Sequence, residues 1–203
     1  MKRNIISSLF IIIGLVLMVS SLGIRMYSKN KEAQLIKEFN NDIALENSKN
    51  DDKNHDKNYG KQKRKIIKYT NGDGDKIAIM EIPSISLQSI IVEGTNMDDL
   101  RYYLGHFKNT AMPAGISGNF SIAGHSSTIY NEILNELYKV NIKDEIKIKT
   151  LTGEYDYIIT KKFVVEPSEV GVLDQDENKK SMTIVTCTDK GKKRLIVKAE
   201  MEK

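Results

Sequence analysis

The residues with the clearest chemical potential are the only cysteine of the chain, Cys187, and the arginine that follows it, Arg194. In the segment SMTIVTCTDKGKKRLIVKAE, residues 181–200, Cys187 ends one β-prone run and Arg194 begins the next. If the runs pair as a hairpin with a symmetric loop, the two residues lie opposite each other, with Cβ atoms about 4.5–5.5 Å apart. A positive charge near a thiol favours the thiolate, the nucleophilic form. The spacing therefore indicates a cysteine nucleophile beside a cation.

The same hairpin register pairs Val185 with Ile196 and Thr183 with Lys198. Non-catalytic roles for Cys187 and Arg194 stay open at this point. A single cysteine is often a small buried hydrophobe, and the arginine is equally compatible with a surface cation on an edge strand. A β-bulge would also shift the register.

A nucleophilic cysteine usually works with a histidine that exchanges protons with the leaving group. The best candidate is His125, which ends the run GNFSIAGH where a predicted strand leaves the core. His106 follows Gly105 in a predicted loop and is the competing candidate, whereas His55 lies in a polar tether and is predicted to be solvated. No Asp or Glu has an evident position as the third member of a catalytic triad with Cys187 and His125. Arg194 is a candidate for that role.

From residue 76 onward, short β-prone runs are separated by turn residues, which is typical of an all-β barrel or sandwich with antiparallel strands. Two segments, residues 96–104 and 129–137, have the pattern of short helices, the first with Asn96 as its N-cap. The predicted strands cover residues 76–82, 89–94, 118–125, 144–150, 154–165, 182–187 and 193–200.

The N-terminal part has a different composition. Residues 5–24 carry no charge and are about as long as a helix that crosses the hydrocarbon core of a bilayer. We therefore predict residues 1–4 as a cytoplasmic N-terminus, 5–24 as a transmembrane signal anchor, and 76–203 as the catalytic domain. Residues 25–75 are predicted to form a juxtamembrane helix and a disordered polar linker. A cleaved signal peptide is the alternative for the apolar stretch.

Composition excludes several classes of function. The net charge of +4 arises from interspersed acids and bases in a chain of 203 residues, which does not indicate a nucleic-acid-binding protein. One cysteine rules out an internal disulfide bond and any metal site built from several cysteines. A thiol redox protein would also lack a resolving cysteine, because the chain has no second cysteine.

Three motifs, in order, resemble the sortase family of cysteine transpeptidases. TIVTC, ending at Cys187, resembles the T-L-x-T-C signature, with Ile184 in place of Leu. GNFSIAGHSS resembles the segment that carries the catalytic histidine, and GHFKNTAMPAGISGN is similar to the stretch before it. Arg194 matches the arginine of that family, early in the strand after the cysteine.

The resemblance implies a mainly β fold, a closed eight-stranded barrel with short helices, preceded by a transmembrane helix and linker. It implies a single-pass enzyme of Gram-positive cell membranes whose catalytic domain is extracellular. Such an enzyme cleaves an LPxTG-like sorting signal of a secreted protein after Thr and forms a thioester on Cys187. It then transfers the protein to an amine of the cell-wall peptide, lipid II-like. His125 is the implied general acid and base, Arg194 the oxyanion stabiliser, and His106 a structural residue.

The segment between the last two long strands, residues 166–181, is too short for the helix typical of class B sortases. The chain ends soon after Arg194 without a second hydrophobic span, which argues against class C. Class D is the most similar class and class A the near alternative. The acidic residues Asp174, Asp176 and Glu177 are interpreted as a solvated loop, so no metal and no cofactor is expected. An inactive, membrane-tethered binding module is the alternative function, and residues that bind the sorting signal are not identifiable.

Overall fold

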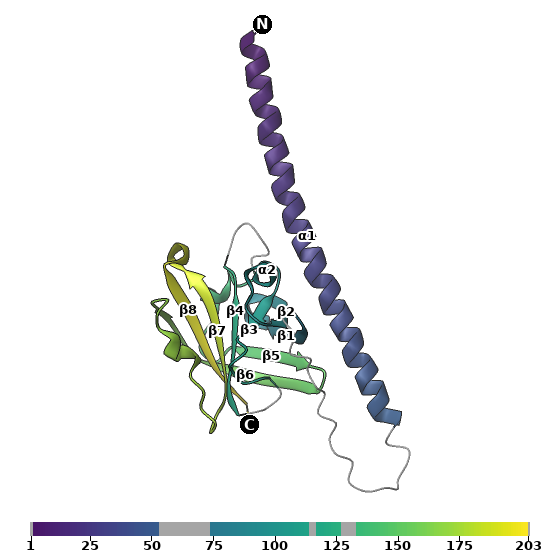
Figure 1. Cartoon of the computed structure of the whole chain (residues 1–203), viewed down its shortest axis with the longest axis vertical. Helices are drawn as coiled ribbons and strands as arrows, with labels where there is room; N and C mark the ends of the chain where they lie inside the picture. The colour runs from purple at the N-terminus through teal and green to yellow at the C-terminus, as the bar shows by residue number, and fades with distance from the viewer. Residues whose placement is uncertain (1, 53–73, 114–116, 127–132, 203) are drawn as a thin grey trace.

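A computed structural model describes residues 2–52, 74–113, 117–126 and 133–202. In these residues a long helix, α1 (Lys2–Asp52), lies beside a closed barrel and extends past it (Figure 1). The eight strands of the described barrel are β1 (Lys76–Ile82), β2 (Leu87–Glu93), β3 (Leu104–His106), β4 (Gly118–Gly124), β5 (Glu145–Thr150), β6 (Gly153–Val165), β7 (Lys180–Thr188) and β8 (Lys193–Met201).

The barrel closes in the order β1-β2-β3-β4-β7-β8-β6-β5. Strand β5 shows how the sequence directs this closure, because its sequence EIKIKT alternates strictly. Ile146, Ile148 and Thr150 are buried, while the intervening charged residues are half-buried. Successive side chains of a strand point to opposite faces, so this pattern places one face inside the barrel. The mainly β, closed-barrel prediction is confirmed.

Several strand predictions agree closely with the structure, but the predicted antiparallel pairing is wrong for two pairs of strands. β1 covers residues 76–82 as predicted, and β6 extends the predicted strand by one residue at its start. The expected antiparallel arrangement does not hold throughout, because β2 pairs with β3, and β4 with β7, in parallel. The connection from β2 to β3 contains the short helix α2, and the connection from β4 to β7 contains the strands β5 and β6.

The first predicted short helix is shorter than expected. α2 spans only Met97–Leu100, with Asn96 at its N-cap position, and the chain then turns into the short strand β3. Sequence periodicity missed β3 because a strand of three residues presents no repeating pattern. Of the second predicted helix, residues 129–132 lie outside the described residues; residues 133–136 are in turns, and a 3-10 helix, η2 (Leu137–Lys139), follows.

Helix α1 packs against the outer face of β1 and β2 along its second half. Phe39 is 1% exposed and lies in a cluster with Ile79, Ile90, Val92 and Tyr103. Leu35, Ile36 and Ile43 of the helix pack against the same cluster. These helix positions recur at the spacing of one helical face, which explains why this segment docks.

A helix is present in the segment where a juxtamembrane helix was predicted, but it is not a separate element. α1 is continuous over Lys2–Asp52, so it joins the apolar stretch to the first part of residues 25–75, the predicted helix and linker. Polar residues such as Ser48, whose hydroxyl donates to the carbonyl of Ala44 at 2.9 Å, form its last described turns. The remainder of the predicted linker, residues 53–73 with His55, lies outside the described residues.

The apolar N-terminal part of α1 has exposed side chains, from Leu9 at 56% to Val19 at 62%. Within the ranges given above, none of the helices combines the length and the apolar character that crossing a membrane requires.

Candidate active site

Parallel pairing of β4 with β7 brings His125 and Cys187 to the same end of the barrel. Gly124 is the register partner of Thr186, and each strand therefore delivers its next residue to the same edge. The Thr186 hydroxyl donates to the Gly124 carbonyl at 2.8 Å, and the Ser126 hydroxyl donates to the Cys187 carbonyl at 2.5 Å. Side-chain hydrogen bonds thus join the ends of β4 and β7 where their backbone pairing stops.

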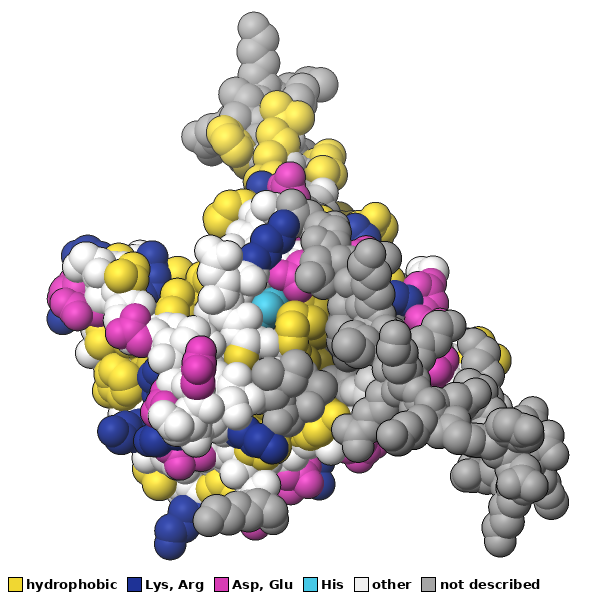
Figure 2. Space-filling view, turned by 60° about the horizontal axis from the view of Figure 1, so that its bottom comes forward, with side chains coloured by type: hydrophobic (Ala, Val, Ile, Leu, Met, Phe, Trp, Pro, Cys, Tyr) yellow, Lys and Arg dark blue, Asp and Glu magenta, His cyan; other side chains and the backbone are white. Residues whose placement is uncertain are grey.

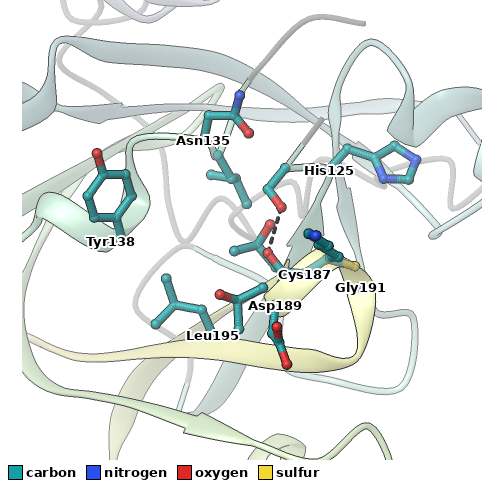
Figure 3. Close-up of a pocket in the computed structure, with 12 residues that line it drawn as sticks. His125, Asn135, Tyr138, Cys187, Asp189, Gly191 and Leu195 are labelled. Atoms are coloured by element: carbon teal, nitrogen blue, oxygen red, sulfur yellow. Dashed lines mark hydrogen bonds between the residues drawn. The ribbon is translucent and has the colours of Figure 1, made fainter. Parts of the chain in front are cut away.

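His125 and Cys187 line one cavity of about 440 Å³. In Figure 3 the His125 ring and the Cys187 sulfur lie on the same side of the site, away from Tyr138. The cavity is open to solvent, and Figure 2 shows a histidine side chain reaching the surface among hydrophobic, basic and acidic side chains. The remaining lining residues are Ser126, Leu134, Asn135, Tyr138, Thr186, Thr188, Asp189, Lys190, Gly191 and Leu195.

Gly124, directly before His125, allows close packing of two leucine side chains. A Cβ atom at this position would lie 2.5 Å from a methyl carbon of Leu104 and 2.7 Å from one of Leu134. The backbone amide of Leu134 also donates to the His125 carbonyl at 3.2 Å. The glycine therefore lets the chain around residue 134 close over the strand end that carries the histidine.

The predicted hairpin register is confirmed in every pair. Cys187 lies opposite Arg194, Val185 opposite Ile196, and Thr183 opposite Lys198. Directly opposed residues project from the same face of a sheet, so the thiol and the guanidinium stem share one side.

The guanidinium of Arg194 is held by its own hairpin loop. It donates to the Gly191 carbonyl at 2.9 Å and to the Lys193 carbonyl at 3.1 Å. The loop curls because Asp189 and Lys190 have φ values of 47° and 54°, in the left-handed region, ahead of Gly191 at 88°. The register of the β7–β8 hairpin therefore places Arg194 beside Cys187. The guanidinium group itself contacts carbonyls of the hairpin loop at the end of the barrel.

Two effects lower the pKa of His125. Burial lowers its pKa most, and the positive charge of Arg101 lowers it further. Both act against the imidazolium, because burial removes hydration and a second cation repels the first. The structure thus adds Arg101, which also contacts Asp98 at 3.5 Å, to the electrostatics of the site.

The competing histidine, His106, lies elsewhere, in the barrel wall. It is 1% exposed, and its Nδ1 atom lies 3.2 Å from both carboxylate oxygens of Glu93. On its other side, Nε2 is 3.1 Å from the Ala111 carbonyl and 3.0 Å from the Thr110 hydroxyl. These contacts tie the chain after β3 to the barrel, which is a structural use of histidine.

The acidic residues Asp174, Asp176 and Glu177 follow the 3-10 helix η3 (Val170–Leu173). A side-chain oxygen of Asp176 accepts from the backbone amide of Asn178 at 3.0 Å, so it closes a local turn. In the part of the chain that the structure describes, no three or more His, Cys, Asp or Glu side chains gather in a metal-binding arrangement.

Sequence reasoning missed three polar residues: Arg101, which acts on the pKa of His125, and Asn119 and Gln175, which contact each other at the other end of β4. Arg101 gave no signal, because it follows two acids in a short amphipathic stretch. Asn119 is only 2% exposed, and an asparagine inside the apolar run GNFSIAG was a usable sign of a buried polar contact. Gln175 gave none, since glutamine in a polar loop is ordinary.

A closed barrel with a cysteine, a histidine and an arginine at one end matches known proteins. Residues 80–202 match the model of the sortase domain. Sortase D of Bacillus subtilis is 29% identical over 126 residues, which cover 62% of this chain and 61% of that relative. The chain thus spans less than two thirds of the length of this relative. Sortase A of Listeria monocytogenes is 25% identical over 211 aligned positions, covering 100% of this chain and 93% of that protein.

Among solved structures, the Sortase D5 transpeptidase of Clostridium perfringens is 49% identical, with a TM-score of 0.61. The match covers 65% of this chain and 82% of that one. The chain therefore belongs to the sortase family. Its similarity to Sortase D and Sortase D5 makes it class D-like, as the sequence motifs predict.

Proposed function

We propose that this chain is a cysteine transpeptidase that acts on proteins with an LPxTG-like sorting signal. The observation that carries the proposal is the shared cavity of His125 and Cys187, with Arg194 opposite the cysteine in the β7–β8 hairpin. Family membership supports the same reaction class, because the relatives named above are sortases.

In the first half-reaction, the Cys187 thiolate attacks the Thr carbonyl carbon of the sorting signal. The carbonyl oxygen becomes an oxyanion, and Arg194 would stabilise it after leaving the carbonyls of its own loop. When the C–N bond breaks, the His125 imidazolium gives its proton to the leaving amine. The products are a thioester on Cys187 and a released peptide with a new amino terminus.

In the second half-reaction, the neutral His125 imidazole takes a proton from the incoming amine. The amine attacks the thioester carbonyl, the C–S bond breaks, and the thiolate returns. The proposed acceptor is an amine of the cell-wall peptide, lipid II-like. Because the pKa of His125 is lowered by burial and by Arg101, its neutral, proton-accepting form is favoured.

We also propose that residues 5–24 attach the enzyme to the cell membrane, with the catalytic domain, residues 76–203, outside. Support comes from the absence of charge in this stretch of sequence and from the exposure of its described apolar side chains. Protease treatment of intact cells should degrade the barrel, and a barrel that survives until lysis would contradict this orientation.

The test of the reaction uses the full chain in mild detergent, with LPxTG-type peptides and an amine acceptor. Mass spectrometry should find a thioester on Cys187 and the joined product. Cys187→Ala should abolish both, and loss of the general acid in His125→Ala should lower kcat by about 10²–10⁴-fold. Peptide binding without any adduct or product, by folded enzyme, would instead support the inactive binding module.

A further inference from the structure

Helix α1 lies along the barrel in a defined direction. It contacts the early part of β2, where the Ser89 hydroxyl donates to the Glu32 carboxylate at 2.5 Å. Further along the helix, it contacts the first residue of β1, where the Lys76 ammonium lies 3.2 Å from a carboxylate oxygen of Asp42. Because β1 and β2 are antiparallel, their starts lie at opposite ends of the barrel. α1 therefore runs from one end of the barrel towards the other.

The end of the barrel near Glu32 is the catalytic end. β4 and β7 both stop there, and they lead to His125 and Cys187. β3 is antiparallel to β4 and parallel to β2, so β2 and β3 begin at the end where β4 stops. In Figure 1 the C-terminus marks the opposite end of the barrel, and the N-terminal half of α1 points away from it. The helix therefore leaves the barrel past its catalytic end.

Lys31 makes a second contact between α1 and the catalytic end. Its ammonium lies over the ring of Tyr102, 4.7 Å from the ring centroid. The preceding residue, Arg101, is the cation that acts on His125. The turn between α2 and β3 thus contacts the helix with one residue and influences the proposed catalytic histidine with the residue before it.

The contact between Glu32 and Ser89 is buried, although both side chains are polar. Glu32 is 8% exposed and Ser89 is 0% exposed. A buried carboxylate is costly unless a hydrogen-bond donor replaces its water, so this contact restricts where the helix can dock. The apolar cluster around Phe39 continues the docked face about two turns further along α1. A directed contact and apolar packing together hold the helix in place.

The predicted membrane anchor lies close to this docked contact. The anchor ends at residue 24, and α1 is continuous from there through Glu32. At 1.5 Å per residue, the distance along the helix from residue 24 to Glu32 is about 12 Å. A continuous helix carries position and direction, which a flexible chain does not. The helix therefore fixes both the height and the orientation of the catalytic end relative to the anchor.

We propose that α1 is a rigid support that holds the cavity of His125 and Cys187 towards the membrane surface, with Glu32 and Ser89 as positioning residues. This inference rests on the proposed membrane attachment and the proposed transpeptidase reaction. A cavity held near a surface meets the molecules in that surface at a raised effective concentration. The support should therefore favour acceptor amines carried by lipids over the same amines in solution.

Two insertions separate a rigid support from a flexible tether. Seven alanine-rich residues inserted after residue 26 add about two helical turns, so they move the cavity about 10 Å from the membrane and nearly keep its direction. The insertion leaves both the predicted anchor and the docked contacts intact. The same insertion after residue 60, between α1 and β1, is the matched control. Because α1 docks directly on the barrel, the control should not move the cavity.

Point variants test the docked contact itself. Glu32→Lys should loosen the helix, because a second ammonium then lies next to Lys31 and the Ser89 hydroxyl loses this acceptor. Glu32→Gln keeps an oxygen that accepts from Ser89 and should behave as wild type. Asn40→Lys, at an exposed position of the same helix, is the control for added positive charge.

The position of the cavity can be measured without turnover, because Cys187 is the only cysteine of the chain. A dye on this thiol would report energy transfer to a headgroup dye in phosphatidylcholine vesicles that hold the full chain. Transfer should be strong in wild type, and weaker in Glu32→Lys and after the insertion at residue 26. Glu32→Gln, Asn40→Lys and the insertion at residue 60 should match wild type. Equal transfer in all variants would overturn the support.

The rate measurement uses the same vesicles, because phosphatidylcholine has no primary amine. It compares free triglycine with a lipid that carries a triglycine headgroup. The insertion at residue 26 should lower the rate with the lipid about tenfold or more, and change the rate with free triglycine about twofold or less. An equal change with both acceptors would contradict the support. If wild type uses neither acceptor, the transpeptidase proposal fails, and the energy-transfer measurement still decides whether α1 is a rigid support.

Discussion

Two outer faces of the barrel are covered in opposite ways. On the helix-covered face, formed by β1 and β2, α1 buries Phe39 against Ile79, Ile90 and Val92. On a second face, formed by β4, β7 and β8, residues 170–175 are held by the amides of Asn119 and Gln175. One cover depends on apolar area, the other on directed hydrogen bonds.

The two kinds of contact have different physical effects on the segments that they hold. Apolar burial is roughly proportional to area and is non-directional, so it adds stability without fixing each atom. Hydrogen bonds between amides fix distances and angles, but each contributes modestly to net stability. The hydrogen bonds to residues 170–175, beside β4 and β7, therefore fix the position of that segment. The cover on β1 and β2 is the one that contributes most to stability.

The largest effect should come from Phe39→Ala. Truncating a side chain that is 1% exposed removes its packing and leaves a cavity, which typically costs about 3–5 kcal/mol. Urea unfolding of the full chain in mild detergent would measure the free energy. Leu45→Ala, on the same helix but 60% exposed, is the control and should change stability by no more than about 0.5 kcal/mol. Equal effects of both variants would show that α1 does not dock on the barrel.

Asn119→Ala should have the next largest effect on stability, about 1–3 kcal/mol, because it leaves the buried Thr183 hydroxyl and two carbonyls without this partner. The same urea titration measures it, with the exposed Asn178→Ala as the control. A loss as large as that of Phe39→Ala would remove the distinction between the two faces.

A smaller effect is expected from Lys76→Ala at the edge of the helix-covered face. The Lys76 ammonium lies 3.2 Å from a carboxylate oxygen of Asp42 and 3.7 Å from one of Glu38. Exposed pairs of this kind contribute about 0–1 kcal/mol, and salt screens them. The difference from wild type should shrink in high salt, and a salt-independent loss would mean that the lysine stem stabilises by packing.

Arg101→Gln tests the electrostatics of the site with little expected change in stability. Removing this charge should raise the pKa of His125, so the imidazolium would persist to higher pH. Burial, the larger cause, would still hold the pKa below its usual value. An NMR titration of the His125 ring measures the shift, and Arg101→Lys, which keeps the charge, is the control. No difference between the two variants would exclude Arg101 as a cause.

The sequence predicted elements with strong periodicity or known motifs. Strict alternation predicted β5, and the hairpin register opposite Cys187 followed from symmetry about the loop. Pairing direction and β3 could not be predicted, because they depend on which distant strand lies alongside. Contacts of single polar side chains, such as those of Gln175 and Arg101, are fixed by tertiary geometry and leave no local pattern in the sequence.

The parallel pairing of β4 with β7 also has a consequence for the order of events in folding. Gly124 and Thr186, which hold the ends of these strands together, are 62 residues apart. Contacts between distant residues form late, because the intervening chain must first lose its freedom. A newly synthesised chain therefore carries the Cys187 thiol without His125 beside it until the barrel is nearly complete. The proposed catalytic pair is therefore one of the last features of the molecule to form.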